Sequence, residues 1–261
     1  MDSGSGELGL VLASDAHPPL NIAHRGASAK APQNTLVAFR KALEMGADGI
    51  ELDVRLSADG VPVVIHDATV DATTNGRGRV DRMTLDQLKQ LDAGSSFSPA
   101  FAGERIPALN EVLETVGQSM LLNLELKGIQ LSSRALEEAV AGLVERHALE
   151  GNVLISSFNP LALRRVQRIA PHIPTALLYS RPAWPALRLA DLILARPTTA
   201  VHPHYKVADE QHIRWARANH VRVHVWTVDD PVEMRRLIGW GVDGIITNEP
   251  ETLRRLLETT S

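Results

Sequence analysis

Residues 49–67 read GIELDVRLSADGVPVVIHD, and the spacing of the polar residues in this stretch determines how the rest of the chain is interpreted. Two apolar runs, GIELDV and VPVVIH, predict two β-strands. Side chains two residues apart on a strand point to the same face. The first strand therefore places three aliphatic residues on one face and Glu51 and Asp53 together on the other.

Short apolar runs alternate with helical stretches along the whole chain. The strand candidates cover residues 20–24, 48–54, 120–126, 152–157, 174–179, 199–203, 221–226 and 243–247. Helical stretches are predicted over residues 34–45, 132–147, 160–169, 209–219, 231–239 and 249–257. Such alternation is typical of a parallel α/β sheet, and eight repeats predict a (β/α)₈ TIM barrel. A doubly wound open sheet is the alternative.

The segment from about residue 55 to 108 is too long for a single barrel loop. It holds the second strand of the opening stretch, the Gly-rich turn TTNGRGRV and a short helix near residues 84–90, so we expect a small insertion after the second barrel strand. Residues 1–19 are expected to form a disordered or loosely packed lead-in. Residues 20–261 would then form a single barrel domain.

Composition excludes several classes of protein. None of the 261 residues is a cysteine, so disulfides, thiolate metal sites and thiol nucleophiles are impossible. The formal net charge of −4 argues against binding to nucleic acid through bulk electrostatics. No apolar run approaches the ~20 residues that span a bilayer, so we expect no stable membrane association and a cytoplasmic location. The chain is expected to be a monomer or a homodimer.

Acidic residues alternate with aliphatic residues along two of the predicted strands. Glu125 alternates with leucines in LLNLEL, just as Glu51 and Asp53 alternate with aliphatic residues. The aliphatic faces suit packing under helices, so the acidic faces are expected to point into the barrel near its C-terminal mouth. Buried carboxylates need compensation. Either an all-oxygen site for Mg²⁺ or Ca²⁺ or a core ion network with Lys127 and two arginines would supply it.

Two histidines end predicted strands on the same rim. His24 closes the first strand in NIAHRG, and His66 closes the inserted strand in VVIHD. A lone histidine there is more often a structural hydrogen-bonding residue than a catalyst, but two beside an arginine and three acids favour a functional site. Phe158 in ISSFNP is either an apolar wall of the site or a packing residue, and His202 and His204 are candidates for contact with a substrate.

Four stretches place these residues in a specific context. AHRGASAKAPQNTLVAF (23–39), GADGIELDVRLSADGVPVVIHD (46–67), LNLELK (122–127) and VHVWTVDD followed by GVDGIITNEP (223–250) resemble the glycerophosphodiester phosphodiesterase family. The resemblance runs from about residue 22 to 250 and includes the insertion. It implies a barrel enzyme that hydrolyses small-molecule glycerophosphodiesters to glycerol 3-phosphate and an alcohol, with one divalent cation, Mg²⁺ or Ca²⁺.

By motif position, the resemblance implies roles for single residues. His24 and His66 would be the acid–base pair, and either could be the acid. The metal ligands would be Glu51, Asp53 and Glu125. Arg25 and Lys127 would bind phosphate, with Trp226 lining the mouth. The nucleophile would be either water or the glycerol 2-hydroxyl.

Some positions depart from the common pattern of the family. Gln33 stands where the family usually has Glu, Asn248 where it usually has Asp, and SADG (57–60) where it usually has TKDG. Gln33 and Asn248 are expected near the mouth, so they bear on substrate preference. Alternative activities on the same barrel are a lysophospholipid-cleaving phospholipase D and an inositol-phospholipid phospholipase C. A non-enzymatic binding module is a further alternative.

Overall fold

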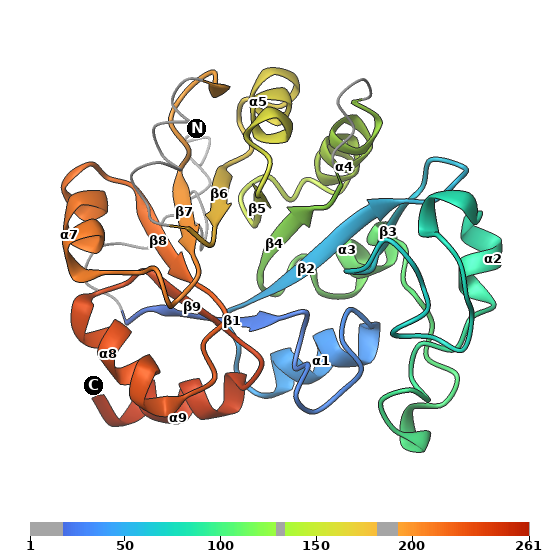
Figure 1. Ribbon diagram of the computed structural model, residues 1–261, viewed down its shortest axis with the longest axis horizontal. Helices are drawn as coiled ribbons and strands as arrows, with labels where there is room; N and C mark the ends of the chain where they lie inside the picture. Colours follow the sequence, from blue (N-terminus) through green and yellow to red (C-terminus); the bar gives the residue numbers. More distant parts are fainter. Residues whose placement is uncertain (1–17, 129–133, 182–192, 261) are drawn as a thin grey trace, which may run out of the picture.

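Eight parallel strands close into a ring in the computed structural model, which describes residues 18–128, 134–181 and 193–260 (Figure 1). They are β1 (Leu20–His24), β2 (Gly49–Leu56), β4 (Leu121–Leu126), β5 (Val153–Ser157), β6 (Thr175–Tyr179), β7 (Ala200–Pro203), β8 (Arg222–Val225) and β9 (Gly244–Thr247). Because β1 pairs with both β2 and β9, the sheet has no open edge between its first and last barrel strands. The predicted (β/α)₈ TIM barrel is confirmed, and the open-sheet alternative is wrong.

Helices cover the outside of this ring (Figure 1). They are α1 (Leu36–Glu44), α3 (Leu109–Val116), α4 (Ala135–Arg146), α5 (Pro160–Ile169), α7 (Glu210–Ala218), α8 (Pro231–Trp240) and α9 (Pro250–Thr260). Side-chain oxygens of Thr35 and Asp209 cap α1 and α7, and proline opens α5 and α8. Residues 1–17 of the predicted lead-in lie outside the described residues. So do residues 132–133, the first two of the helix predicted over residues 132–147.

Apolar packing occupies both sides of the strands. On β2, the aliphatic face packs outward into a core with Phe39 of α1 and Leu109 of α3. Each large aliphatic side chain buried in this way contributes roughly 1.5–3 kcal/mol. A smaller apolar layer inside the barrel consists of Ile22, Leu121, Leu154, Ala176, Ala200 and Ile246. The inward positions nearer the C-terminal ends of β1, β2 and β4 are polar.

The connection between β2 and α3 is the predicted insertion. It contains β3 (Pro62–Val64), the 3₁₀ helices η2 (Val80–Arg82) and η3 (Pro99–Phe101), and α2 (Leu85–Lys89). β3 pairs antiparallel with the end of β2, and the insertion has its own small apolar core. This pairing carries His66, two residues after β3, to the C-terminal mouth of the barrel.

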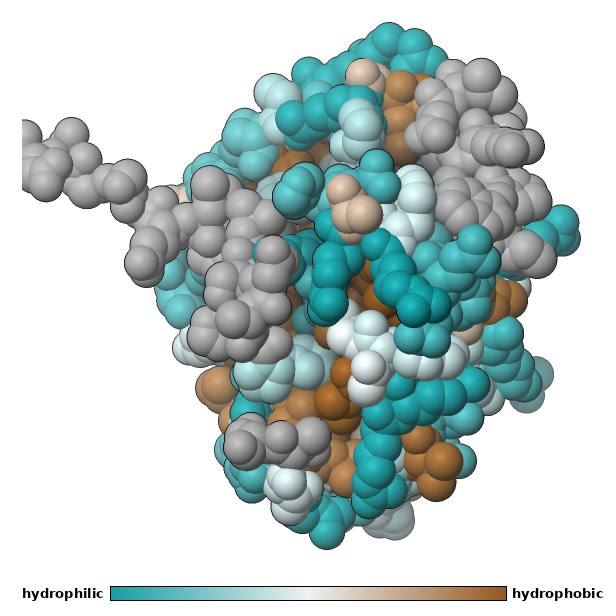
Figure 2. All heavy atoms as spheres, turned by 90° about the vertical axis from the view of Figure 1, so that its left-hand side faces the viewer, coloured by the Kyte–Doolittle hydropathy of each residue, from teal (hydrophilic) through white to brown (hydrophobic). Residues whose placement is uncertain are grey.

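Hydrophilic residues cover most of the coloured surface on the face that carries α7 and α8 (Figure 2). Apolar residues appear there in separate patches, as is usual for a folded protein surface. Among the described residues, the exposed large apolar side chains are Leu43, Phe97, Phe158 and Val232. In the same part of the chain, no helix has both the length and the apolar character needed to cross a bilayer.

Candidate active site

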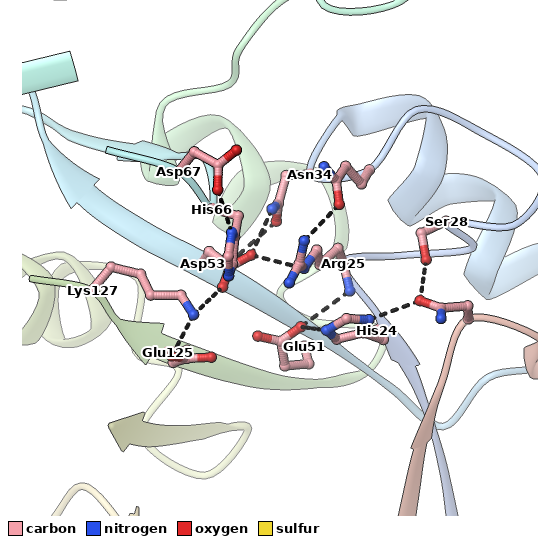
Figure 3. A network of polar contacts seen from close by, with 12 residues as sticks. His24, Arg25, Ser28, Asn34, Glu51, Asp53, His66, Asp67, Glu125 and Lys127 are labelled. Atoms are coloured by element: carbon pink, nitrogen blue, oxygen red, sulfur yellow. Dashed lines mark hydrogen bonds and ion pairs between the residues drawn. The ribbon is translucent and has the colours of Figure 1, made fainter. Parts of the chain in front are cut away.

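Three carboxylates meet inside the mouth of the barrel. Glu51 and Asp53 project from β2, and Glu125 projects from the neighbouring β4 (Figure 3). The parallel register places Asp53 beside Glu125, so both side chains share the inward face. One oxygen of each residue lies within 4.8 Å of the others, and the residues are only 4%, 1% and 6% exposed. Acids this close and this buried require positive charge nearby.

Two basic side chains supply part of that charge. Lys127 Nζ lies 3.0 Å from Asp53 Oδ1 and 2.5 Å from Glu125 Oε1. Arg25 Nε lies 3.2 Å from Asp53 Oδ2. Glu51 Oε2 accepts the backbone N–H of Arg25 at 3.1 Å, whereas Glu51 Oε1 is buried and has no hydrogen-bond partner among the described residues. With every acid ionised, the three carboxylates exceed these two cations by one negative charge.

The pKa shifts reflect this imbalance. Burial, followed by repulsion from Asp53 and Glu125, raises the pKa of Glu51 well above its usual value. Burial likewise raises the pKa of Glu125. Burial opposes ionisation of Asp53 as well, but the adjacent Lys127 and Arg25 outweigh it and leave the pKa of Asp53 lowered. Glu51 is therefore the acid whose ionised form is least compensated by the neighbouring cations, and a bound cation would favour its ionisation.

Glu51→Gln should stabilise the chelator-treated protein, and the gain should grow as the pH rises. Because the folded-state pKa of Glu51 is raised, its contribution to stability is full below its unfolded pKa of about 4.3 and is lost as pH rises through the folded value. Glutamine removes that loss. Thermal unfolding in chelator from about pH 5 to 8 should give the variant a melting temperature several degrees higher at the alkaline end. A difference that is constant or shrinks with pH would contradict this charge distribution.

The turn after β1 fixes Arg25 at the expense of backbone strain. Arg25 and Asn34 have φ values of 56° and 58°, in the left-handed region that costs a non-glycine residue on the order of 1 kcal/mol or more. Gly26 has a φ of 81°, and a Cβ there would lie 2.8 Å from Ala38 Cβ. Asn34 Nδ2 donates to Asp53 Oδ2 at 2.8 Å. The strained turn thus positions both a cation and an amide donor on the same carboxylate.

His24 ends β1 and lies against the carboxylates (Figure 3). Its Nδ1 is 2.7 Å from Asn248 Oδ1, and its Nε2 is 3.9 Å from Glu51 Oε2. Burial, followed by the positive charge of Arg25, lowers the pKa of His24 to about 4. In this charge environment the imidazole is neutral near pH 7 and can accept a proton.

His66 comes from the insertion rather than from a barrel strand. Its Nδ1 lies 2.7 Å from Asp67 Oδ1 (Figure 3). Burial lowers the pKa of His66, while the charge of Asp53 and the hydrogen bond to Asp67 act in the opposite direction. The side chain is 36% exposed, compared with 17% for His24, so water reaches it more easily.

A cavity of about 210 Å³ joins these groups. Its lining residues are His24, Arg25, Glu51, His66, Glu125, Lys127, Phe158, Leu178, Trp226 and Ile246. The last four residues make one wall apolar. Phe158 is 45% exposed and packs edge-on against Trp226, with ring centroids 5.5 Å apart. The cavity therefore combines a charged side with an aromatic side.

Three other histidines lie in or beside the barrel. His202 is fully buried and does not line the cavity, and its ring lies tilted against that of His224 with ring centroids 4.9 Å apart. The expectation that His202 contacts a substrate is therefore wrong. His204 lies beside the rim, with its ring 4.9 Å from that of Trp226. Burial lowers the pKa of both His202 and His224, so both are neutral interior groups.

Some residues that shape the site were not predicted. Leu178 and Ile246 complete the apolar wall, Asn34 bonds Asp53, and Asp67 bonds His66. A polar residue next to a predicted histidine was a usable signal for Asp67. Nothing local distinguishes Leu178 and Ile246 from other apolar strand residues.

The chain is similar to known proteins over most of its length. Residues 24–252 match the model of the glycerophosphoryl diester phosphodiesterase family. The chain belongs to this family. The phosphodiesterase is 45% identical over 243 residues to a glycerophosphodiester phosphodiesterase of Caldanaerobacter subterraneus subsp. tengcongensis, a match that covers 91% of this chain and 97% of the relative. It is 34% identical over 253 residues to a glycerophosphodiester phosphodiesterase of Bacillus subtilis, with 91% and 86% covered.

Solved structures of phosphodiesterases are also similar to this chain. An Oleispira antarctica phosphodiesterase in complex with the product sn-glycerol-3-phosphate superposes with a TM-score of 0.84 at 33% identity, over 92% of this chain and 97% of that one. A putative glycerophosphoryl diester phosphodiesterase from Silicibacter pomeroyi gives a TM-score of 0.85 at 27% identity, over 97% and 98%. The predicted family is confirmed, and the phosphodiesterase is an enzyme with glycerophosphodiester phosphodiesterase activity.

Proposed function

We propose that the enzyme releases glycerol 3-phosphate and an alcohol from glycerophosphodiesters and that it requires one divalent cation. The observation that supports this most directly is the group of three buried carboxylates, Glu51, Asp53 and Glu125, whose oxygens lie within 4.8 Å of one another. Two of them, Glu51 and Glu125, line the cavity that His24 and His66 also line. A phosphodiester is an anion, so a purely acidic cavity would repel it. A cation among the carboxylates removes that repulsion.

The donor set fits Mg²⁺ or Ca²⁺. All three residues offer carboxylate oxygens, which these hard cations prefer. The buried, unpartnered Oε1 of Glu51 and the raised pKa of that residue are consistent with a missing positive charge at this point. When bound, the cation would neutralise charge on a non-bridging phosphate oxygen.

Arg25 and Lys127 are the proposed phosphate contacts. Both line the cavity and face Asp53, with Arg25 also donating from Nη1 to Gln33 Oε1 at 2.7 Å. A guanidinium can hold two phosphate oxygens at once, whereas an ammonium acts as a point charge. The two side chains would therefore orient the phosphodiester and hold it against the carboxylates.

The two histidines are the proposed proton-transfer groups. An alkoxide is a poor leaving group, so one imidazole must protonate it while the other removes the proton of the nucleophile. His24 and His66 line the same cavity from β1 and from the insertion, which allows them to act on different sides of a bound phosphodiester. The aromatic wall formed by Phe158 and Trp226 would pack against carbon atoms of the substrate.

Removing the cation is the direct test. Glycerophosphocholine, glycerophosphoethanolamine, glycerophosphoglycerol and glycerophosphoinositol would each be assayed for glycerol 3-phosphate, with and without EDTA. We expect chelation to lower the rate by at least about 10²-fold and added Mg²⁺ or Ca²⁺ to restore it. Release of a phosphorylated alcohol in place of glycerol 3-phosphate, or a rate that EDTA leaves unchanged, would refute the proposal.

A lysophospholipid would be included in the same panel as the alternative substrate. In the described part of the chain, the half-exposed Phe158 beside the cavity favours a lipid chain, since exposed aromatic rings suit contact with apolar carbon. Faster turnover of lysophosphatidylcholine than of glycerophosphocholine would favour that alternative.

A further inference from the structure

The side-chain amide of Asn248 is held in one orientation by its neighbours. Asn248 follows β9, and its Nδ2 donates to Asp229 Oδ2 at 2.6 Å. Asp229 Oδ1 also accepts the backbone N–H of Asn248 at 2.8 Å and the hydroxyl of Thr247 at 3.0 Å. An ionised carboxylate can only accept hydrogen bonds, so the Asn248 atom that faces it must be the amino nitrogen. The carbonyl oxygen of the same amide therefore points away from Asp229.

That carbonyl oxygen faces His24. Asn248 Oδ1 lies 2.7 Å from His24 Nδ1. A carbonyl oxygen can only accept, so the neutral imidazole must carry its proton on Nδ1. The lone pair then lies on Nε2, the nitrogen 3.9 Å from Glu51 Oε2. Ser28 donates its hydroxyl to the same oxygen at 2.7 Å, but a hydroxyl can also accept and so does not fix the amide.

We propose that Asp229 and Asn248 are positioning residues that fix the Nδ1–H tautomer of His24, so that Nε2 is the nitrogen available for proton transfer. The proposal relies on the proposed function only in giving His24 a part in acid–base chemistry. Asp229 lies in the loop after β8 and does not line the cavity that contains His24. Its hydrogen bonds connect it to His24 through Asn248.

The isosteric change Asp229→Asn should invert this tautomer. The oxygen that accepts from Thr247 and from the backbone can stay in place, which turns the new amino group toward Asn248 Nδ2. Two amino groups cannot bond each other, so Asn248 turns its amide over and donates to His24 Nδ1. The imidazole proton then moves to Nε2, and the lone pair no longer faces the carboxylates.

Tautomers of a histidine can be measured without turnover. In protein labelled with ¹⁵N at histidine, the two ring nitrogens have clearly different chemical shifts when protonated and unprotonated, and the spectrum of His24→Ala identifies the His24 signals. We expect Nδ1–H in the wild type and Nε2–H in Asp229→Asn. In serine proteases an inverted histidine tautomer lowers turnover by orders of magnitude. Here we expect kcat to fall by about 10²-fold or more while KM changes little.

The neighbouring Asp230 offers a matched control. Asp230→Asn removes the same charge one residue away, and Asp230 caps α8 by accepting the backbone N–H of Val232 at 2.8 Å. Asparagine caps a helix as well as aspartate does. This variant should keep the wild-type tautomer of His24 and the wild-type kcat.

The outcomes separate the positioning role from the proposed function. An Nε2–H tautomer of His24 in the wild type overturns the proposal, even if Asp229→Asn does not fold. An unchanged tautomer in folded Asp229→Asn also overturns it. An inverted tautomer with lower kcat supports both the positioning role and the chemistry of His24. An inverted tautomer with unchanged kcat supports the positioning role and removes His24 from the chemistry.

Discussion

Glu125→Gln should lower the rate of glycerol 3-phosphate release by about 10³-fold, although glutamine keeps the size of the side chain. The variant removes one of three carboxylates whose oxygens lie within 4.8 Å of one another. Losing several kcal/mol of charge stabilisation at a phosphate corresponds to a rate change of this order, since about 1.4 kcal/mol is tenfold. Cation binding should weaken in parallel, and calorimetric titration with Mg²⁺ and with Ca²⁺ measures it independently of turnover.

Glu137→Gln is the matched control for this change. Glu137 lies on α4, is 5% exposed, and pairs with Arg165 at 3.2 Å, much as the 6% exposed Glu125 pairs with Lys127. Both substitutions break a buried ion pair and should destabilise the fold. Only Glu125→Gln should lose cation affinity. Equal cation affinity in the two variants would show that Glu125 is not a metal ligand, whatever happens to the rate.

The barrel and the direction of the acidic side chains were predictable from local sequence. A strand has a period of two, so the aliphatic residues that pack under the helices fix where Glu51 and Asp53 point. The same argument places Glu125 on the inward face of β4.

The helix α3 was not predicted. Its N-cap is Ala108, and Glu111 supplies the only capping side chain by reaching back to the Ala108 N–H at 2.7 Å, so the usual Ser, Thr, Asp or Asn signal is missing.

The contacts that orient the site residues could not be predicted from local sequence. His24 and Asn248 are 224 positions apart and meet only because β1 and β9 become neighbours when the barrel closes. Which residue of a strand reaches the mouth depends on the stagger between neighbouring strands. His202 and His204 illustrate this, because one is fully buried while the other lies beside the rim. A sequence motif can identify a candidate site residue, but its hydrogen-bond partners depend on which strands become neighbours in the closed barrel.

His24→Ala and His66→Ala should each slow the chemical step by about 10²-fold or more while leaving cation affinity close to that of the wild type. Neither imidazole belongs to the group of carboxylates that could hold the cation. Single-turnover measurements at saturating glycerophosphodiester isolate chemistry from product release. His172→Ala is the control, because His172 is 49% exposed and pairs only at the surface with Glu145 at 3.4 Å.

The pattern of losses from these variants discriminates between mechanisms. A fall in rate for both variants, with cation affinity retained, is what a paired acid and base require. If only His24→Ala were slow, the proton on the leaving group would have to come from solvent, which reaches the half-buried His66 side of the cavity more readily. If His24→Ala instead lost cation affinity, the 3.9 Å approach of its Nε2 to Glu51 would mean that His24 supports the metal site and not proton transfer.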